Sequence, residues 1–303
     1  RGLGDVYKRQ ARELGREADY ELFMQRAHNY SKLFDPATNF MRPRNLDGSW
    51  LKSCGDRPAE IASFGDHSYY DCFDPLLVGR RPNRYFTESN AWQYIWSVQH
   101  DIKGLVKQFE DPAAFVTKLD SLFTMSPEIS PPKYVGVVGT IGQYVHGNQP
   151  SHHVAYLYNY VGMPWKTQER VSQVMDLYRT GPGGLCGNED MGSLSSWFVL
   201  SAMGIYPVCP GQNVYVIGTP LFEKATISPG SFYGAGDFTI QANQVSPVNK
   251  YIQSATLNGE HMSKTWLSHQ EIVRGGTLIF EMGAEPNPEW GKDASDIPPS
   301  MTR

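Results

Sequence analysis

The sequence predicts a mainly helical protein whose C-terminal part is rich in strands. Before Pro210, apolar residues recur at three- and four-residue spacing, and long polar loops separate the segments with this spacing. After Pro210, short alternating runs of β-branched and aromatic residues replace that pattern. We therefore expect a helical domain over residues 11–210, with helices and long loops alternating as a helical toroid requires, and a β-rich region over residues 211–303 that packs on it.

Six helices are expected in the first part, and the clearest apolar stripe is that of residues 90–109. Gly162 and Gly204 are expected to end two of them, because glycine readily takes the left-handed conformation that closes a helix. Ser151 is placed to cap the start of the helix that Gly162 ends. The expected helices span residues 11–34, 90–109, 112–123, 151–162, 167–178 and 193–203.

The strands expected in the C-terminal region are short and bounded by turn residues. Asn258 and Gly259 form the clearest of these turns, because both residue types accept the positive φ that a two-residue hairpin needs. The expected strands span residues 214–217, 225–227, 238–240 and 277–280.

Composition excludes several classes of function. A net charge of −4 gives no basic surface for nucleic acid, and no run of about 18 apolar residues is present to span a membrane. The 4 cysteines lack CxxC spacing, which argues against structural zinc and leaves any disulfide pairing open. Aromatic residues make up 13% of the chain, with 7 Trp and 17 Tyr, and such rings suit the apolar face of a sugar.

The first ten residues differ in character from the rest. Residues 1–10, RGLGDVYKRQ, resemble translated adapter sequence joined to a truncated reading frame. The chain begins with Arg1, and no signal segment precedes Ala11. We set residues 1–10 aside from the fold prediction and expect the chain to be a fragment.

Two acidic residues occupy a glycine-bounded loop directly before the expected helix 193–203. Glu189 and Asp190 lie between Gly187 and Gly192. Such a loop can hold carboxylates and direct them into a pocket. An acid close to the tryptophan of the next helix, Trp197, suggests sugar chemistry.

A third acid, Glu88, lies where a loop meets the expected helix 90–109. Asn90, Trp92 and Gln93 follow it closely. A carboxyl group among aromatic rings is expected to be desolvated and to keep its proton for donation near neutral pH. The alternative is that Glu88 only caps the helix that it precedes.

Residues 144–153 form an amide- and histidine-rich loop. His152 and His153 are adjacent and point to different faces of a helix, and no HExxH spacing is present, so zinc is not expected. Asn148 and Gln149 offer neutral oxygen ligands, which suit calcium when carboxylates supply the remaining charge. The alternative is an asparagine-rich turn with surface histidines whose hydrogen bonds are satisfied.

Three long motifs resemble the C-terminal part of the glycoside hydrolase family 92 alpha-mannosidases. The resemblance extends from about Leu14 to Phe222 and more weakly to Phe280. It implies a calcium-dependent, inverting exo-hydrolase of α-mannosides in N-glycans or mannans, built from an N-terminal β-sandwich and an (α/α)6 domain. The chain lacks the β-sandwich and the early helices. The motifs are ESNAWQY at 88–94, HGNQPSHHVAYLYNYVGMPWKTQ at 146–168 and GNEDMGSLSSWFVLSAMGIYPVCPG at 187–211.

The resemblance implies roles for the acidic residues. Glu88 corresponds to the general acid and Asp190 to the general base, with a carboxyl separation of roughly 6.5 to 9.5 Å that leaves room for a water molecule. Asn188 stands where the family often has Asp, so it and Glu189 are expected only to support the base.

The resemblance also implies a metal and a substrate subsite. Asn148 and Gln149 correspond to a calcium-binding loop in which many members have Glu at the second position, and the lost charge is expected to weaken binding. In this family the metal engages two hydroxyl groups of the sugar. A periplasmic or secreted protein is implied as well. The candidate substrate-binding residues are Trp92, Gln93, His146, His153 and Trp197.

Three alternatives stay open. Another (α/α)6 carbohydrate enzyme, such as a disaccharide phosphorylase, needs a phosphate-binding cluster near Glu88, and none is evident. A non-catalytic sugar-binding protein would place Glu88 and Asp190 more than about 12 Å apart. The fragment alone could also be inactive, since apolar helix faces would lack their partners. The preferred linkage (1,2, 1,3, 1,4 or 1,6) is left open.

Overall fold

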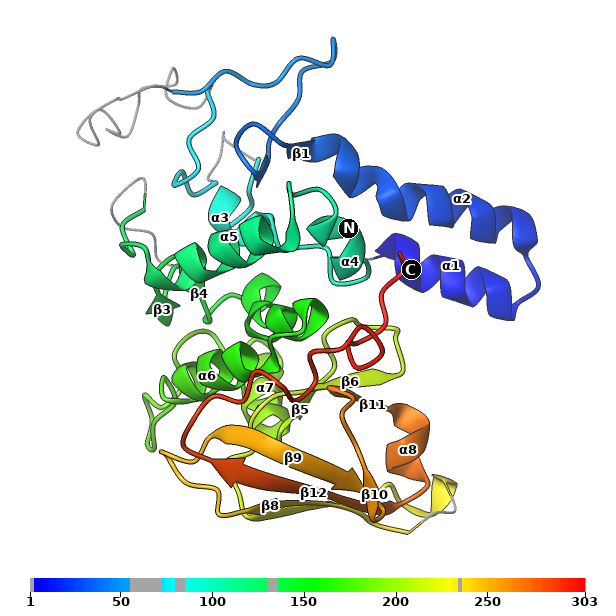
Figure 1. The fold of residues 1–303 in the computed structure, drawn as a ribbon. Helices are drawn as coiled ribbons and strands as arrows, with labels where there is room; N and C mark the ends of the chain where they lie inside the picture. The colour runs from blue at the N-terminus through cyan, green and yellow to red at the C-terminus, as the bar shows by residue number, and fades with distance from the viewer. Residues whose placement is uncertain (1–2, 55–71, 80–84, 130–135, 234–235, 303) are drawn as a thin grey trace. The chain divides into compact units, whose positions relative to one another are not determined.

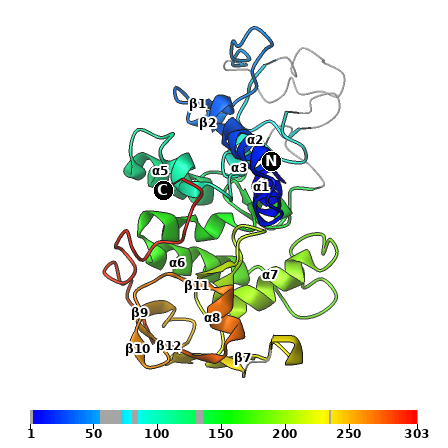
Figure 2. The ribbon, with the colours of Figure 1, turned by 90° about the vertical axis from the view of Figure 1, so that its right-hand side faces the viewer.

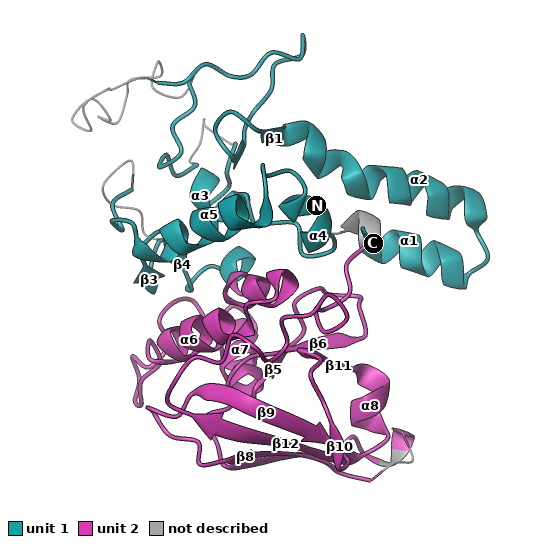
Figure 3. Ribbon diagram, in the orientation of Figure 1, with its two compact units in different colours: residues 1–151, 302 teal, residues 152–301, 303 magenta. Residues whose placement is uncertain are grey.

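The computed structural model describes residues 3–54, 72–79, 85–129, 136–233 and 236–302. The chain forms two compact units (Figure 3): unit 1 comprises residues 1–151 and 302, and unit 2 comprises residues 152–301 and 303. The division therefore falls at 151/152, whereas composition suggested a change near residue 210. The predicted catalytic domain at 11–210 stays a prediction.

Unit 1 begins with two helices that lie side by side in both views (Figure 1 and Figure 2). They are α1 (Leu3–Glu13) and α2 (Glu17–Ala27), and the 3-10 helix η1 (His28–Leu33) follows. The single helix predicted for 11–34 is therefore wrong, because Gly15, with a φ of 66°, turns the chain between α1 and α2. Most of residues 1–10, which the fold prediction leaves out, lies in α1.

The remaining elements of unit 1 are short. Two hairpins pair antiparallel, and a disulfide joins Cys54 to Cys72. The predicted helix 112–123 is confirmed as α5. In chain order the elements are β1 (Phe34–Asp35), β2 (Phe40–Met41), α3 (Ala91–Tyr94), α4 (Ile102–Val106), α5 (Pro112–Thr124), β3 (Thr140–Ile141), β4 (Tyr144–Val145) and η4 (Gln149–Ser151).

The helix predicted for 90–109 is wrong, because two separate helices, α3 and α4, take its place. Asp101 starts the second one: its fully buried carboxylate accepts the Gly104 N–H at 3.2 Å. The same carboxylate accepts bonds from the Tyr30 hydroxyl at 2.9 Å and from the Thr302 N–H at 2.8 Å. A buried acid that recruits these donors fixes a new N-terminus inside the apolar stripe.

Unit 2 begins with three helical segments, η5 (Val154–Val161), α6 (Pro164–Met175) and α7 (Ser193–Ala202). The predicted helix 151–162 is a 3-10 helix, and His153, not Ser151, occupies its N-cap position. Gly162 ends it with a φ of 69°, as expected. Helix α6 starts earlier than predicted because Pro164 suits the first helical turn, and α7 is confirmed.

Two sheets complete unit 2. The three-stranded sheet has the order β11-β6-β5 and the five-stranded sheet the order β10-β9-β12-β8-β7. In the larger sheet β8 and β12 run parallel, and its other named pairs are antiparallel. Helices α6 and α7 lie on one side of the five-stranded sheet (Figure 1), and α6 contacts β9. The elements are β5 (Ile205–Tyr206), β6 (Val214–Ile217), β7 (Lys224–Ile227), η6 (Ser231–Tyr233), β8 (Phe238–Asn243), β9 (Tyr251–Leu257), β10 (Glu260–His261), β11 (Trp266–Ser268), α8 (His269–Val273) and β12 (Gly276–Gly283).

The core of unit 2 joins these sheets. Ile217 from the smaller sheet and Phe238 and Phe280 from the larger one have no exposed surface and belong to one apolar cluster. The turn at Asn258 and Gly259 closes the β9–β10 hairpin with φ values of 53° and 86°, as predicted. The strand-rich C-terminal region is thus confirmed, and the (α/α)6 toroid stays a prediction.

Among the helices described here, none is both long enough and apolar enough to cross a bilayer.

Candidate active site

Glu88 occupies a strained turn in unit 1. Its φ is 56°, a left-handed conformation that is uncommon for residues other than glycine, and its side chain is exposed. The cap of the following helix, α3, is Asn90, whose side-chain oxygen accepts the Gln93 N–H at 3.3 Å. The alternative role of Glu88 as a helix cap is therefore wrong. The expected desolvation of Glu88 among aromatic rings is not seen in this chain either.

A buried amide network supports this turn. Asn90 Nδ2 donates to Gln143 Oε1 at 3.0 Å, and Gln93 Nε2 donates to the Gln143 carbonyl oxygen at 3.4 Å. Gln143 Nε2 in turn donates to the carbonyl oxygens of Ser126 and Glu128 at 2.6 and 2.7 Å. Because buried amides are costly when unpaired, these bonds fix α3 in one position.

The amide-rich loop reaches the same turn. Asn148 is 7% exposed, and its Nδ2 donates to the carbonyl oxygen of Glu88 at 3.0 Å. This bond crosses 60 positions of sequence. The structure therefore brings together two of the three predicted loops, and Asn148 holds the backbone of the candidate acid.

The same loop carries the residues predicted to bind calcium. Asn148 and the half-buried Gln149 carry the hard oxygen donors that calcium prefers. Within the described ranges, however, no group of three or more His, Cys, Asp or Glu residues could hold a metal ion. The two amides thus match calcium in donor type but supply none of the negative charge.

Asp190 lies in a second left-handed turn, in unit 2. Asp190, Met191 and Gly192 have successive φ values of 50°, 59° and 87°, and α7 starts at the next residue. The side chains of Asp190 and Asn188 are exposed. Three left-handed residues in a row reverse the chain and leave the Asp190 carboxylate at the surface of the unit.

Glu189 has a different role from its neighbour. Its Oε2 accepts the Ser195 hydroxyl at 2.9 Å and its Oε1 accepts the Ser195 N–H at 3.3 Å. Its carbonyl oxygen accepts the Ser193 N–H at 3.0 Å. A carboxylate that pairs with the free N–H groups of the first helical turn stabilises a helix. Glu189 therefore supports Asp190 by anchoring the turn to α7.

The residues predicted to bind substrate are buried. Trp197 Nε1 donates to the His152 carbonyl oxygen at 2.9 Å, and the Trp197 ring stacks on Tyr178. Tyr144 and His146 are joined through the tyrosine hydroxyl and Nδ1 at 2.7 Å. Direct contact with a sugar stays a prediction for the whole set. The exposed fractions are 8% for Trp92, 2% for Gln93, 0% for His146, 3% for His153 and 0% for Trp197.

Glu88 belongs to unit 1 and Asp190 to unit 2, so their expected separation stays a prediction. Gln143, the centre of the amide network, is not among the site residues predicted from the sequence. No local signal marks it, because its partners lie up to 53 positions away. The left-handed turns were detectable in part, since Gly192 follows Asp190 closely.

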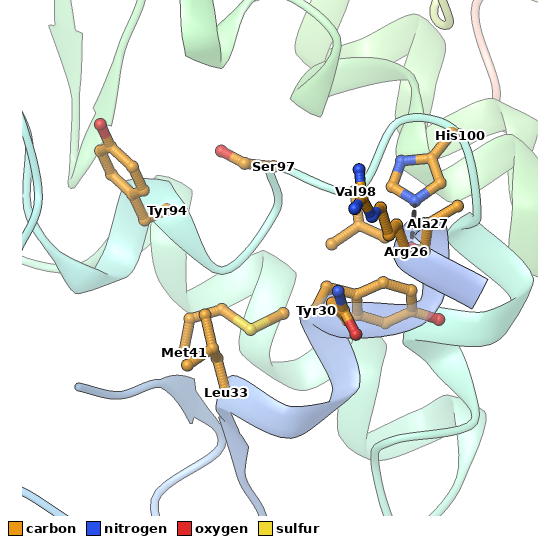
Figure 4. A pocket seen from close by; sticks show the side chains of 10 residues that line it. Arg26, Ala27, Tyr30, Leu33, Met41, Tyr94, Ser97, Val98 and His100 are labelled. Atoms are coloured by element: carbon orange, nitrogen blue, oxygen red, sulfur yellow. Dashed lines mark hydrogen bonds between the residues drawn. The ribbon is translucent and has the colours of Figure 1, made fainter. Parts of the chain in front are cut away.

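Unit 1 also contains a small cavity of about 140 Å³ (Figure 4). Tyr30, Met41 and Val98 are among its lining residues, and His100 Nε2 lies 2.9 Å from the Ala27 carbonyl oxygen beside it. None of the predicted site residues lines this cavity.

Comparison with known proteins assigns the family. Residues 6–284 match the profile of the glycosyl hydrolase family 92 catalytic domain. The chain is 30% identical over 302 residues to an uncharacterized secreted glycosidase of Arthroderma benhamiae. The matched region covers 95% of this chain and 35% of that protein.

Solved structures agree with this assignment. A family GH92 alpha-mannosidase of Bacteroides thetaiotaomicron, in complex with mannoimidazole, is 34% identical with a TM-score of 0.84, over 98% of this chain and 37% of that one. A family GH92 inverting mannosidase of Bacteroides thetaiotaomicron VPI-5482 is 35% identical with a TM-score of 0.78, over 98% and 39%.

The chain thus spans between 35% and 39% of the length of these relatives. The resemblance inferred from the three motifs is confirmed over nearly the whole chain. Since the family profile extends from residue 6 to residue 284, the chain belongs to glycosyl hydrolase family 92.

Proposed function

We propose that the full-length protein is a calcium-dependent, inverting exo-α-mannosidase that acts on N-glycans or mannans. One observation carries the proposal: Glu88 and Asp190 are exposed carboxylates on left-handed backbone, with φ values of 56° and 50°. Strain of this kind persists where the surrounding structure fixes it, and it is common at catalytic sites. Family membership and the two mannosidases among the solved relatives support the choice of substrate.

The mechanism follows from the two carboxyl groups. Glu88 donates its proton to the glycosidic oxygen as the bond from that oxygen to the anomeric carbon breaks. Asp190 removes a proton from a water molecule, which attacks the anomeric carbon from the opposite face. The product is β-mannose. In the next turnover Glu88 must regain a proton and Asp190 must lose one, and both exchange with solvent.

Calcium has a more limited basis in the chain itself. Asn148 and Gln149 would hold the ion through their side-chain oxygens, and carboxylates from elsewhere in the full-length protein would complete the charge. When bound, the ion supplies a positive charge that orients the hydroxyl groups of the sugar. Asn148 also holds the Glu88 carbonyl oxygen at 3.0 Å, so this residue serves the acid turn even without the metal.

The architecture of the whole protein is part of the proposal. Residues outside this chain would complete an (α/α)6 ring and add an N-terminal β-sandwich, since the chain spans 37% of the matched alpha-mannosidase. Secretion or export to the periplasm is supported by the Cys54–Cys72 disulfide, because disulfides persist in oxidising compartments. The fungal relative is also named as secreted.

Proton NMR of the products tests the proposal directly. The full-length protein is mixed with an aryl α-mannoside, and β-mannose should appear first and mutarotate later. Initial α-mannose would contradict inversion.

Removal of the metal is a separate test. Treatment with a chelator should abolish the activity and added calcium should restore it. Activity that the chelator leaves unchanged would refute the metal requirement. Disaccharides with each of the four linkages then define the specificity, and binding without hydrolysis would identify a lectin-like protein.

A further inference from the structure

The cavity of unit 1 extends from the surface of the unit into its core (Figure 4). Met41 and Val98, which line it, are 6% and 1% exposed, whereas the lining residues Arg26 and Asn29 are exposed. Its volume of about 140 Å³ is close to that of an apolar cavity of about 150 Å³ that binds benzene in another protein. The space therefore fits one six-membered ring, and its open end lies at Arg26 and Asn29.

Aromatic side chains form part of the cavity wall, and their polar atoms have partners within the protein. The Tyr30 hydroxyl donates to Asp101 at 2.9 Å, and the Tyr30 ring meets the His100 ring edge to face with centroids 5.8 Å apart. The Tyr94 hydroxyl donates to the Thr87 carbonyl oxygen at 3.0 Å. Because these contacts fix the rings, the wall is preformed, and little conformational entropy is lost when a ligand binds.

The charge of the lining residues favours an anionic ligand. Among them Arg26 carries a permanent positive charge, and none is acidic. The Arg26 guanidinium lies in the last turn of α2, 5.7 Å from the centroid of the Phe23 ring. Asp101, the acid bonded to the Tyr30 hydroxyl, does not line the cavity. A carboxylate at the open end would therefore meet a guanidinium, and the Asn29 amide adds a further donor.

We propose that this cavity is a binding site for small aromatic carboxylates of the benzoate class. The ring packs against Tyr30 and Met41, whose thioether makes favourable contacts with aromatic rings, and the carboxylate stays at the open end beside Arg26. A pyranose carries hydroxyl groups around its ring, which the buried side chains of Met41 and Val98 cannot satisfy. None of the predicted glycosidase residues lines the cavity, so this site is separate from the proposed reaction.

Tyr94 connects the cavity to the turn that carries Glu88. Its ring lines the cavity, and its hydroxyl holds the carbonyl oxygen of Thr87, the residue before Glu88. A ligand packed in the cavity restricts the Tyr94 ring and so stabilises this turn. Hydrogen exchange over residues 86–89 should therefore slow when the cavity is filled. An effect on hydrolysis rests on the proposed function, whereas binding does not.

Titration of the full-length protein with benzoate tests the proposal. Ligand-observed NMR should give a Kd of about 1 mM, which is typical of a ligand with so few atoms. Benzamide has the same ring without the charge and should bind about 5-fold more weakly, the contribution of a partly exposed ion pair. Binding that does not saturate by about 10 mM benzoate, as when residues outside this chain fill the cavity, would overturn the proposal.

Substitution of Arg26 tests the role of the charge. Arg26→Gln should weaken benzoate binding about 5-fold and leave benzamide binding unchanged, because only the ion pair is lost. Arg12→Gln is the matched control. Arg12 is likewise an exposed arginine in the last turn of a helix, 5.8 Å from the centroid of the Tyr20 ring, but it does not line the cavity. Arg12→Gln should leave the affinities for both ligands unchanged.

Substitution of Ser97 tests the space itself. Ser97 is half-buried and lines the cavity, so Ser97→Phe should fill it and weaken both ligands at least about 10-fold. Thermal unfolding checks that the variant is folded. Benzoate affinity that is equal in the parent and Arg26→Gln, or in the parent and folded Ser97→Phe, would overturn the proposal. Exchange over residues 86–89 that benzoate leaves unchanged would refute the link to the Glu88 turn. Each of these results is obtained without a hydrolysis assay, so it is independent of the glycosidase proposal.

Discussion

The turn that carries Glu88 and the turn that carries Asp190 are stabilised by different kinds of contact. Both expose a carboxylate on left-handed backbone, but Asn148 holds the Glu88 turn from 60 positions away, whereas Glu189 bonds to Ser195 only six positions ahead. A locally stabilised turn can form as soon as its helix forms. A turn held by distant segments depends on the folding of the whole unit, so the Glu88 turn should be the more sensitive of the two.

Removal of the carboxylates should have the largest effect. Asp190→Asn should lower kcat by about 10² to 10⁴ for every mannoside, because each turnover needs an activated water. Glu88→Gln should cause a similar loss with alkyl leaving groups but little loss with activated aryl mannosides, which leave without protonation. Steady-state kinetics of the full-length variants measures both. Equal losses from Glu88→Gln with all leaving groups would contradict its role as the acid.

Substitution of Gln143 tests whether contacts between distant segments stabilise the region of the Glu88 turn. Gln143→Leu leaves Asn90 Nδ2 and the carbonyl oxygens of Ser126 and Glu128 without their buried partner. Asn90 is fully buried, whereas Ser126 and Glu128 are exposed and can bond to water. We therefore expect a loss of about 1–3 kcal/mol in the stability of this region, the cost of one unpaired buried group. Hydrogen exchange at residues 88–93 measures it.

The matched control for that variant is Gln108→Leu. Gln108 is half-buried, lies two positions after the end of α4 and donates a hydrogen bond of 3.5 Å from its side-chain nitrogen to the Gly104 carbonyl oxygen. Gln108→Leu should leave hydrogen exchange at residues 88–93 unchanged. If Gln143→Leu and Gln108→Leu both show the hydrogen-exchange rate of the parent protein there, the amide network does not hold α3.

The two turns also differ in how far the sequence predicted them. Glycines around Asp190 and the apolar stripe of the next helix are local signals, and α7 was predicted within one residue. The Glu88 region was predicted as one long helix because its apolar spacing continues through Val98 and Ile102. The break is set by Asp101, whose partners Tyr30 and Thr302 lie 71 and 201 positions away. No short-range pattern contains that information.

The site residues show the same difference between local and long-range signals. Glu88, Asp190 and Asn148 could be named from long motifs, and the structure links Glu88 to Asn148 by a hydrogen bond. Gln143 could not be named, since its role depends on a pairing with Asn90 that only the folded unit creates. Burial was also missed: the motif suggested sugar contact for Trp197, yet its ring has no exposed surface.

Glu189→Ala tests whether local bonds stabilise the Asp190 turn, and it should have a smaller effect than Gln143→Leu. It removes the side-chain bonds to Ser195 in the first turn of α7, whose N-cap position is occupied by Gly192. A carboxylate near a helix N-terminus contributes about 0.3–1 kcal/mol, so we expect a loss of that size. Faster hydrogen exchange should be confined to the first turn of α7, which urea titration can follow as well. Glu223→Ala is the control, because this exposed acid in the same unit lies at no helix N-terminus. Changes that spread through unit 2 would show that Glu189 does not act locally.

The smallest effect should be an increase in stability. Met191 has a φ of 59° and a fully exposed side chain, so Met191→Gly removes strain without loss of packing. We expect a gain of up to about 1 kcal/mol, reduced by the greater freedom of glycine in the unfolded chain.

Met203, with a φ of −76° at the other end of α7, provides the matched control. Met203→Gly should instead lose stability, because glycine brings no relief of strain there and a packed side chain disappears. Thermal unfolding of the two variants compares the signs directly, and a loss from Met191→Gly as large as that from Met203→Gly would contradict a strained turn beside Asp190.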